Sequence, residues 1–435
     1  MKLTKSTGYI LVFLFFFYII YFFALTSVCE RFFLIKGYDR CEVPDFELLA
    51  LFLILAISVS FFLPRNNKPS TVLVWTIYLM HVFGAIALVP YFVSTIKEVH
   101  FIMVLLIMLG YITFSILVQK ISLSIKFVNL SSSVIFLIIY SLLLINLLLL
   151  IYTFGIRYNF ASIFSVYDVR AVFKAEMRTV DNPFVSYAIL LTAFMLSPLN
   201  ILYGLHSFGE SKLKSLLMTL TGLFATSQIF AIAAFKSSIA VVLLTVPMSL
   251  YIGKKNDPFF RFIMVIASII LILFLIQFTG LNRSGIDHWF RRVFITPSMN
   301  VIYYFEAFGF FNFGSGAHAP SFISEEYYGS PGSANSGLIG NGFAKGGVFG
   351  VILNLLILSI FCILLDAVTK FAPASVSLPL AFVIGYSFSN SAATTVLASY
   401  GGFLMIFVLY SMSGGLKRNY KFLTDVDTRT KTRCV

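Results

Sequence analysis

Runs of about twenty apolar residues recur along the whole chain and decide what it can fold into. A helix needs roughly 20 such residues to cross about 30 Å of hydrocarbon, and a helix satisfies its own backbone hydrogen bonds in lipid. The chain is 59% hydrophobic and 11% charged, with a mean hydropathy of +0.94. This composition predicts an all-α polytopic membrane protein rather than a water-soluble one. Twelve membrane-spanning helices are expected, near residues 8–28, 45–63, 71–93, 100–118, 132–152, 184–205, 215–234, 237–252, 262–279, 346–365, 372–391 and 395–413.

The apolar stretch from 215 to 252 is too long for one span, because a single helix over it would be nearly twice as long as the hydrocarbon is thick. We therefore predict a break near Lys236.

Charge indicates how the chain is oriented. If both termini lie in the cytoplasm and the chain alternates sides, the inner segments carry the entire formal net charge of +13. The basic excess then follows from topology and anionic lipid headgroups, and nucleic acid is not expected as a partner. No small-residue cleavage pattern follows the first apolar run, which predicts a retained signal anchor. We expect a single integral membrane domain over 1–435 that ends in a basic cytoplasmic tail, 414–435.

Two outer segments are long enough to have a function of their own, 153–183 and 280–345. The second includes "TPSMNVIYYFEAFGFF", in which Thr296 and Pro297 resemble the start of a helix and Gly309 its end. This pattern predicts a short helix lying along or dipping into the outer membrane surface. "DHWFRRVF" precedes it and brings Arg291 and Arg292 to its start.

Cysteine and polar residues narrow the possibilities further. Cys29 and Cys41 share the first outer loop, where either a disulfide or two free thiols can occur. No Cys and His cluster has zinc spacing. No Asp, Glu, Lys or Arg lies deep in a predicted span, which disfavours an ion-coupled transporter. His81 is either a ligand or, as is more usual, a histidine paired with a neighbouring carbonyl.

Glycines crowd the segment "SPGSANSGLIGNGFAKGGVFG" at 330–350. Gly342, Gly346 and Gly350 recur every four residues, which predicts one bare helix face that another span approaches closely. Upstream, Asn335 and Ser336 present donors just before the helix. This part indicates either a loop shaped for a polar ligand or a plain re-entrant turn.

Four segments carry a resemblance to a known family: "VYDVRAVF" (166–173), "AAFKSS" (233–238), "FRRVFITPSMNVIYYFEAFG" (290–309) and "ANSGLIGNGFAKGGVFG" (334–350). Together they resemble the Wzy-type polymerases of O-antigen and capsule repeat units, over roughly 150–365. The resemblance implies a fold similar to the C-type glycosyltransferases, in the bacterial inner membrane. It also implies that the two long loops and the active site are periplasmic. The expected partners are undecaprenyl-diphosphate-linked glycans, membrane lipids, a chain-length regulator and a flippase.

The implied chemistry requires fixed cations, because a lipid diphosphate leaves with growing negative charge. The resemblance places catalytic roles on Arg170, Arg291 and His318, the last as general base, with Glu325, Glu326, Asp287 and His288 as other candidates for the base. The residues expected to bind substrate are Arg292, Lys236, Arg178, Asn335 and Lys345. The ordinary alternative is that the cations bind lipid headgroups or pair with Asp168, Glu176 and Glu306.

Neither a metal nor another cofactor is expected. The D-x-D pattern at Asp425 and Asp427 lies in the cytoplasmic tail, and arginines can supply the positive charge that magnesium would provide. Two other functions remain open. An O-antigen ligase would share the fold, whereas a flippase or exporter should line a central cavity with charge.

Overall fold

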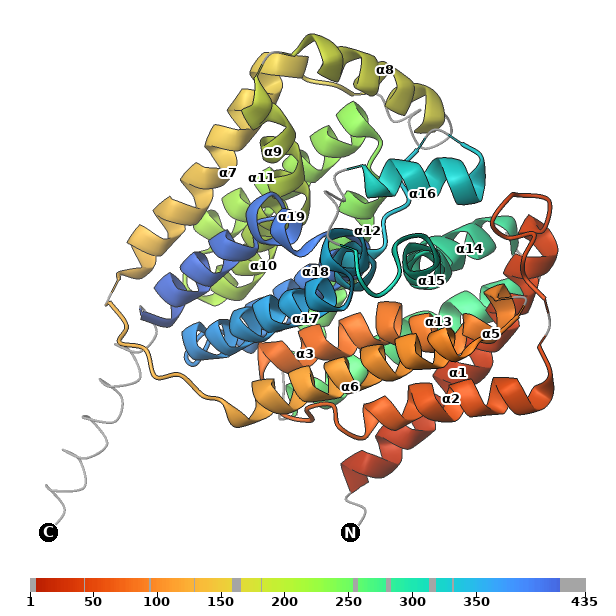
Figure 1. The fold of residues 1–435 in the computed structure, drawn as a ribbon. Coiled ribbons are helices and arrows are strands. Elements are labelled where there is room, and N and C mark those ends of the chain that lie inside the picture. Colours follow the sequence, from red (N-terminus) through yellow and green to blue (C-terminus); the bar gives the residue numbers. More distant parts are fainter. Residues whose placement is uncertain are drawn as a thin grey trace, which may run out of the picture. The chain divides into compact units, whose positions relative to one another are not determined.

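In the computed structural model the described residues form helices joined by turns and irregular segments, and they contain no strand (Figure 1). They are 5–42, 44–93, 95–128, 130–158, 166–180, 182–252, 257–278, 283–312, 318–330 and 332–414. The predicted tail with Asp425 and Asp427 lies outside them except for its first residue. Among the described residues, nine helices are long and apolar enough to cross a membrane. They are Val12–Phe32, Pro69–Ala87, Glu98–Lys120, Ser132–Phe154, Phe184–Gly209, Lys212–Ala233, Pro258–Ile276, Gly337–Val368 and Ala393–Gly414.

The other three predicted spans correspond to shorter helices. These are α2 (Phe46–Ser60), α12 (Lys236–Ile252) and α18 (Ala374–Asn390). The fold is therefore that of a polytopic membrane protein with nine full-length candidate spans in its described part.

The chain divides into two compact units. Unit 1 comprises 1–121, 257–363 and 385–393, and unit 2 comprises 122–256, 364–384 and 394–435. Besides α2, the elements of unit 1 are α1 (Lys5–Phe32), α3 (Pro69–Ile77), η1 (Tyr78–Val82), α4 (Phe83–Ala87), α5 (Val89–Phe92), α6 (Glu98–Lys120), α13 (Pro258–Phe278), α14 (Arg283–Phe290), η5 (Arg291–Ile295), α15 (Thr296–Phe308), α16 (Ala319–Tyr328) and most of α17 (Gly337–Val368). Besides α12, unit 2 contains α7 (Ser132–Phe154), α8 (Val166–Thr179), α9 (Pro183–Leu191), η3 (Thr192–Leu196), α10 (Ser197–His206), η4 (Ser207–Gly209), α11 (Lys212–Ala233), most of α18, α19 (Ala393–Ala398) and a helix over 402–414.

The predicted break near Lys236 is confirmed. Helix α11 ends at Ala233, and Ala234 adopts a left-handed conformation with φ of 51°. A new helix, α12, then begins at Lys236. A non-glycine residue in this conformation is uncommon, so the surrounding structure must hold it there.

Two π-helical turns each lead directly into a proline. In η3 the turn precedes Pro198, and in η5 it precedes Pro297. Proline lacks an N–H and its ring clashes with the carbonyl four residues back. A wider π turn at this position relieves that conflict and lets the helix continue.

The predicted helix start at Thr296 is wrong for this reason. The chain is helical from α14 through η5 into α15, so Thr296 lies inside a continuous helix. The helix ends where the sequence predicts, because α15 ends at Phe308 and the next residue, Gly309, has φ of 68°. Residues 297–305 are all buried in protein, so other parts of the protein cover this helix.

The predicted glycine face is wrong as well. Helix α17 breaks at Gly346 and Gly347, and Gly347 has φ of 56° and ψ of −135°. The break folds the chain back, so that a Cβ on Gly342 would lie 2.7 Å from the Val351 Cα. Gly342 and Gly350 therefore contact one another across the break, whereas Gly346 faces open space.

Close helix packing that depends on glycine occurs instead in unit 2, between α10 and α11. A Cβ on Gly204 would lie 2.9 Å from the Ser215 carbonyl oxygen, and one on Gly222 would lie 3.0 Å from that of Ser197. The Ser197 hydroxyl donates to the Gly222 carbonyl at 2.7 Å. Small residues thus let these two apolar helices approach until polar groups meet.

Candidate functional site

The side chain of Arg291 is the most enclosed cation of the predicted site. It projects from η5 and is 8% exposed. Its guanidinium carbon lies 4.2 Å from the ring centroid of Phe32 and 5.3 Å from that of Tyr38. Both rings are buried and therefore strengthen the cation–π attraction by keeping water away. We call Phe32 and Tyr38 the aromatic cage.

One turn earlier, Asp287 is a fully buried carboxylate. It accepts hydrogen bonds from the Ser27 hydroxyl at 3.1 Å and from the Arg31 guanidinium at 2.9 Å. A buried charge is costly unless it is paired, so this contact ties the end of α1 to α14. Arg31 cannot be identified from the sequence as part of this site, because its partner Asp287 lies 256 residues away.

His288 lies between these charged groups. An Arg291 nitrogen is 3.5 Å from its Nδ1 atom. A guanidinium can only donate, so this contact leaves the ring proton on Nε2, where it can be donated. Partial burial lowers the pKa of His288, and Arg291, Arg31 and Arg292 lower it further. The imidazole is therefore neutral at pH 7. We call Arg31, Asp287, His288, Arg291 and Arg292 the Arg291 cluster.

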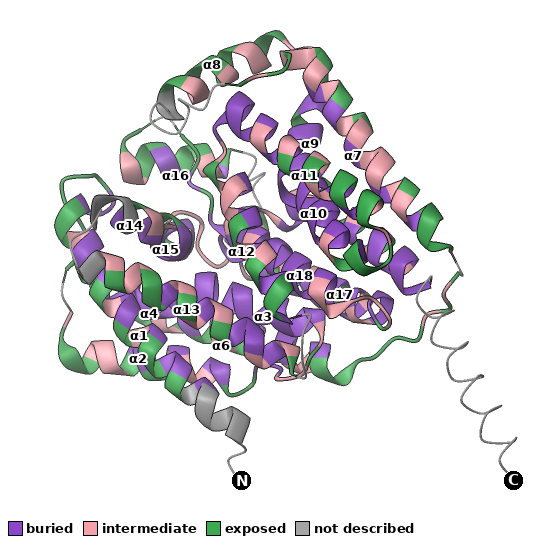
Figure 2. Ribbon diagram, turned by 180° about the vertical axis from the view of Figure 1, so that it is seen from behind, coloured by how far each residue is buried: buried purple, intermediate pink, exposed green. Residues whose placement is uncertain are grey.

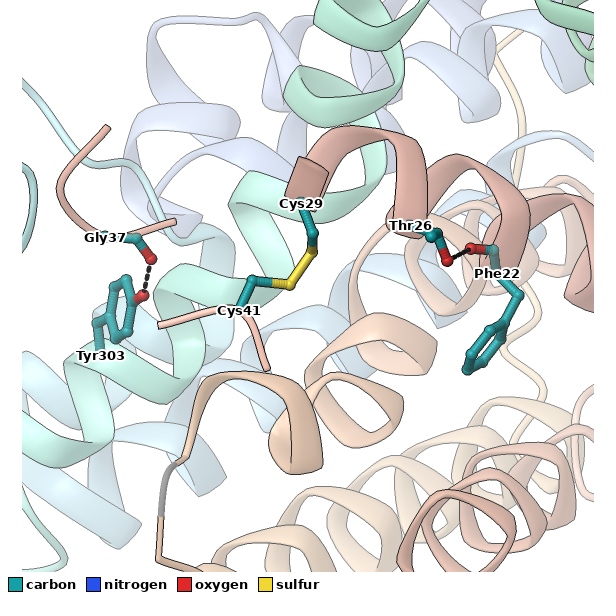
Figure 3. Close-up of a disulfide and its surroundings, with 6 residues drawn as sticks. All are labelled: Phe22, Thr26, Cys29, Gly37, Cys41 and Tyr303. Atoms are coloured by element: carbon teal, nitrogen blue, oxygen red, sulfur yellow. Dashed lines mark hydrogen bonds between the residues drawn. A yellow bond between two sulfur atoms is a disulfide. The ribbon is translucent and has the colours of Figure 1, made fainter. Parts of the chain in front are cut away.

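Cys29 and Cys41 form a disulfide, which settles the alternative that the sequence left open (Figure 3). Residues 30–40, which we call the disulfide loop, are bonded to α15. The Gly37 carbonyl accepts from the Tyr303 hydroxyl (Figure 3). The Tyr38 hydroxyl lies 2.6 Å from that of Thr296. The side chain of Arg40 pairs with Glu306 at 3.2 Å.

Helix α15 also holds the loop over 330–336. The Asn300 side chain donates to the Asn335 carbonyl at 2.7 Å and accepts from the Tyr328 hydroxyl at 2.6 Å. The Tyr304 hydroxyl donates to the Ala334 carbonyl at 2.9 Å. The side chain of Asn335 itself is exposed. This loop therefore has a fixed backbone in unit 1 and an accessible amide.

In unit 2 the predicted cations lie on α8 and at the start of α12. The guanidinium of Arg170 donates to the Ala234 carbonyl at 3.2 Å, which helps to hold the left-handed residue between α11 and α12. Arg178 and Lys236 are exposed. We call these three residues the α8 region. Figure 2 shows that α8 is only partly covered by protein.

A second contact fixes α8 to its unit. Arg157 pairs with Glu176 at 2.6 Å, and its backbone exchanges two hydrogen bonds of 3.0 Å with the Gln228 side chain. Glu176 is thus committed to Arg157. Glu306 pairs with Arg40, and neither Arg157 nor Arg40 is a predicted site residue. These two pairs therefore do not bear out the alternative that the predicted cations pair with Glu176 and Glu306.

The predicted residues thus belong to different units. Unit 1 contains Arg291, Arg292, His318, Asn335 and Lys345, and unit 2 contains Arg170, Arg178 and Lys236. His318 is exposed and precedes α16, whose Glu325 and Glu326 are also exposed. Arg292 and Lys345 are exposed too.

Two further expectations concern polar groups elsewhere. The ring nitrogens of the buried His81 have no hydrogen-bond partner, so the predicted pairing with a carbonyl is wrong. It is the His81 carbonyl that accepts a bond, from the Ser298 hydroxyl at 3.0 Å. Within the described ranges, no group of three His, Cys, Asp or Glu side chains could hold a metal ion.

Comparisons of the chain with models of protein families, with curated proteins and with solved structures find no match. The chemistry of the two cationic regions is therefore the basis for inferring a function. In the Arg291 cluster, guanidinium groups and the His288 Nε2–H can bind the oxygens of a phosphate or diphosphate.

Proposed function

We propose that this protein joins lipid-linked oligosaccharide repeat units into O-antigen or capsular polysaccharide, and that it is a metal-independent glycosyltransferase. The observation that carries the proposal is the Arg291 cluster, where Arg31, Arg291 and Arg292 all act on His288 in a protein otherwise poor in charge. Asp287 is the one carboxylate among the five residues of the cluster, so its three arginines leave an excess positive charge that favours an anionic ligand. The resemblance to Wzy-type polymerases identifies that anion as the diphosphate of an undecaprenyl-linked glycan.

In the proposed reaction, a sugar hydroxyl of the acceptor attacks the anomeric carbon of the donor glycan. A carbon–oxygen bond forms there as the bond to the diphosphate breaks, and the electron pair leaves with the diphosphate. Arg291, with Arg31 and Arg292 beside it, stabilises the charge that develops on the leaving group. His288 donates its Nε2 proton in a hydrogen bond to the same oxygens and is therefore not the base. His318, which is exposed, accepts the proton of the attacking hydroxyl.

The polymerisation uses two lipid diphosphates, one on the donor and one on the acceptor. Each unit of the protein has cations of the kind that bind such a group, the Arg291 cluster in unit 1 and the α8 region in unit 2. We therefore propose that Arg170, Arg178 and Lys236 bind one lipid-linked substrate and the Arg291 cluster the other. Asn335 and Lys345 contact the substrate of unit 1.

We also propose that α2, α12 and α18 complete a set of twelve spans with a fold like that of C-type glycosyltransferases. Both termini then lie in the cytoplasm of a bacterial inner membrane, and the two cationic regions face the periplasm. A periplasm-dependent reporter fused after Ala319 should be active, and one fused after Lys255 should be silent. The opposite pattern would refute this orientation.

Two other activities use similar proteins. An O-antigen ligase would transfer the glycan to a lipid A core by the same chemistry at the diphosphate. A flippase or exporter is less well supported, because charged residues are scarce in the described spans.

Deletion of the gene separates these possibilities. Surface polysaccharide from the deletion strain, analysed on a gel, should carry single repeat units in place of long polymer. Loss of all surface repeat units would instead indicate a flippase. Long polymer that remains lipid-linked and fails to reach the lipid A core would indicate a ligase.

A further inference from the structure

The rings that surround Arg291 come from a different part of the chain than Arg291 itself. Phe32 is the last residue of α1, and Tyr38 belongs to the disulfide loop. Arg291 lies in η5. The position of its guanidinium is therefore set by how the disulfide loop packs against the helix.

The disulfide loop is fixed to this helix at several points. The Tyr38 hydroxyl bonds to Thr296, its ring packs against Tyr328 with centroids 6.1 Å apart, and the neighbouring Gly37 carbonyl accepts from Tyr303. A Cβ on Gly37 would lie 2.9 Å from the Tyr327 carbonyl oxygen. This close approach leaves no room for the loop to shift without moving Tyr38.

The Cys29–Cys41 bond closes the loop at its two ends. Cys29 lies in the last turn of α1, three residues before Phe32, and Cys41 lies three residues after Tyr38. Phe32 and Tyr38 therefore both lie within the loop that the disulfide closes. Without it, the chain from Phe32 to Cys41 would be restrained by its noncovalent contacts alone.

We propose that the aromatic cage of Phe32 and Tyr38, closed by the Cys29–Cys41 disulfide, positions the Arg291 guanidinium to bind a diphosphate. Phe32 and Tyr38 are positioning residues, since they act through Arg291. The inference rests on the proposed function and adds that the diphosphate site of unit 1 is assembled only where the disulfide forms. An oxidising compartment such as the periplasm meets that condition.

Farnesyl diphosphate is a suitable probe, because it carries the diphosphate on a short isoprenoid. The chain has two tryptophans, and Trp289 is two residues from Arg291. In a Trp75→Phe background, Trp289 fluorescence of the detergent-purified protein reports binding. Tyr38→Leu removes one ring of the cage and should raise the Kd by about threefold to thirtyfold. Tyr38→Phe keeps the ring and should stay within about twofold of the parent.

Tyr111→Leu is the matched control. Tyr111 is buried in the same unit, and its hydroxyl donates to the Val74 carbonyl, away from Arg291. It should lower thermal stability and leave the Kd of the folded fraction unchanged. Equal Kd values for Tyr38→Leu and the parent would overturn the role of the cage.

The disulfide is tested on protein that has already folded. Treating the purified parent with a reductant should raise the Kd in the same direction as Tyr38→Leu. The Cys29→Ser/Cys41→Ser variant should bind weakly with or without reductant. Unchanged binding after complete reduction, verified by thiol labelling, would overturn the role of the disulfide.

A different result of the binding experiment would refute the proposed function itself. If the parent does not bind farnesyl diphosphate, or if equimolar short-chain phosphatidylglycerol displaces it, the site does not select a diphosphate and the proposed function falls together with this inference. If the parent binds and all variants bind equally well, the inference alone falls.

Discussion

The two cationic regions of this protein are built in different ways. In the Arg291 cluster, Arg291 is 8% exposed, its guanidinium lies against two aromatic rings, and the buried Asp287 one turn earlier is paired with Arg31. In the α8 region, Arg178 and Lys236 are exposed, and Arg170 reaches a backbone carbonyl at the end of another helix. A group held rigidly can stabilise a transition state without reorganising, whereas exposed cations on a partly covered helix are better suited to capturing a substrate.

This difference predicts that the two regions will respond unequally to substitution. Loss of the enclosed cation should reduce turnover, and loss of the exposed ones should mainly weaken substrate binding.

Arg291→Ala should give the largest loss. It removes a charge-assisted contact and leaves the aromatic cage empty, so polymer yield should fall by at least about a hundredfold. Arg291→Lys should recover only part of it, because lysine lacks the planar fork. Lys36→Ala removes an exposed cation of the disulfide loop and is the control. An equal loss in Lys36→Ala, at matched expression, would mean that general positive charge is what matters.

Gly347→Ala should be the most destabilising change at the break in α17. A Cβ there would collide with the Phe310 carbonyl oxygen, and the backbone has φ of 56° and ψ of −135°. We expect a loss of about 2 to 4 kcal/mol of stability, seen as a lower thermal midpoint by size-exclusion chromatography.

Gly346→Ala is its control, because the neighbouring Gly346 has extended φ and nothing within 4 Å of its Cβ position. It should retain the parent's midpoint. A similar loss in both variants would contradict this description of the break.

Arg170 separates substrate binding from lipid binding in unit 2. If its guanidinium grips a diphosphate, Arg170→Ala should cost about tenfold to a hundredfold in activity, and Arg170→Lys should recover only part. If Arg170 only binds lipid headgroups, the Arg170→Lys variant should be as active as the parent. Lys174→Ala, an exposed cation on the same helix, should be neutral. Full activity of Arg170→Ala would confine the diphosphate site to the Arg291 cluster.

The smallest effect concerns pH. Because burial and Arg291, Arg31 and Arg292 lower the pKa of His288, with only Asp287 opposing them, the unfolded chain takes up this proton more readily than the folded protein. Stability from this group is complete above about pH 6.5, the ordinary pKa of histidine, and declines as the pH falls below it. The thermal midpoint should therefore fall between pH 7 and pH 5, and less steeply in His288→Gln. If the midpoint changes equally with pH in the parent and in His288→Gln, these arginines do not lower the pKa of His288.

Local signals in the sequence predicted the features that depend on neighbouring residues. The apolar runs mark the helices, the length of 215–252 requires the break at Lys236, and Gly309 ends α15. The predictions that were wrong concern features whose structure depends on contacts between residues far apart in the sequence. Thr296 and Pro297 are typical of a helix start, but the π turn of η5 lets the helix continue through them.

The candidate site, too, could be predicted only where neighbouring residues determine it. Arg291 could be singled out from its sequence context, but not its pairing with groups far along the chain. The rings of the aromatic cage reach Arg291, and Arg31 reaches the neighbouring Asp287, only through tertiary packing. The glycine spacing in α17 was similarly misleading, because helical periodicity cannot predict a break in the helix that bears it.

The central claim is that this chain joins lipid-linked repeat units by using the Arg291 cluster to stabilise a leaving diphosphate. The most direct measurement supplies undecaprenyl-diphosphate-linked repeat units to the purified protein in vesicles, with a chelator present and no other enzyme. The account predicts a ladder of polymer with release of undecaprenyl diphosphate, and its loss in Arg291→Ala protein of equal folded amount. Absence of polymer with the parent protein, or an undiminished ladder with Arg291→Ala, would contradict it.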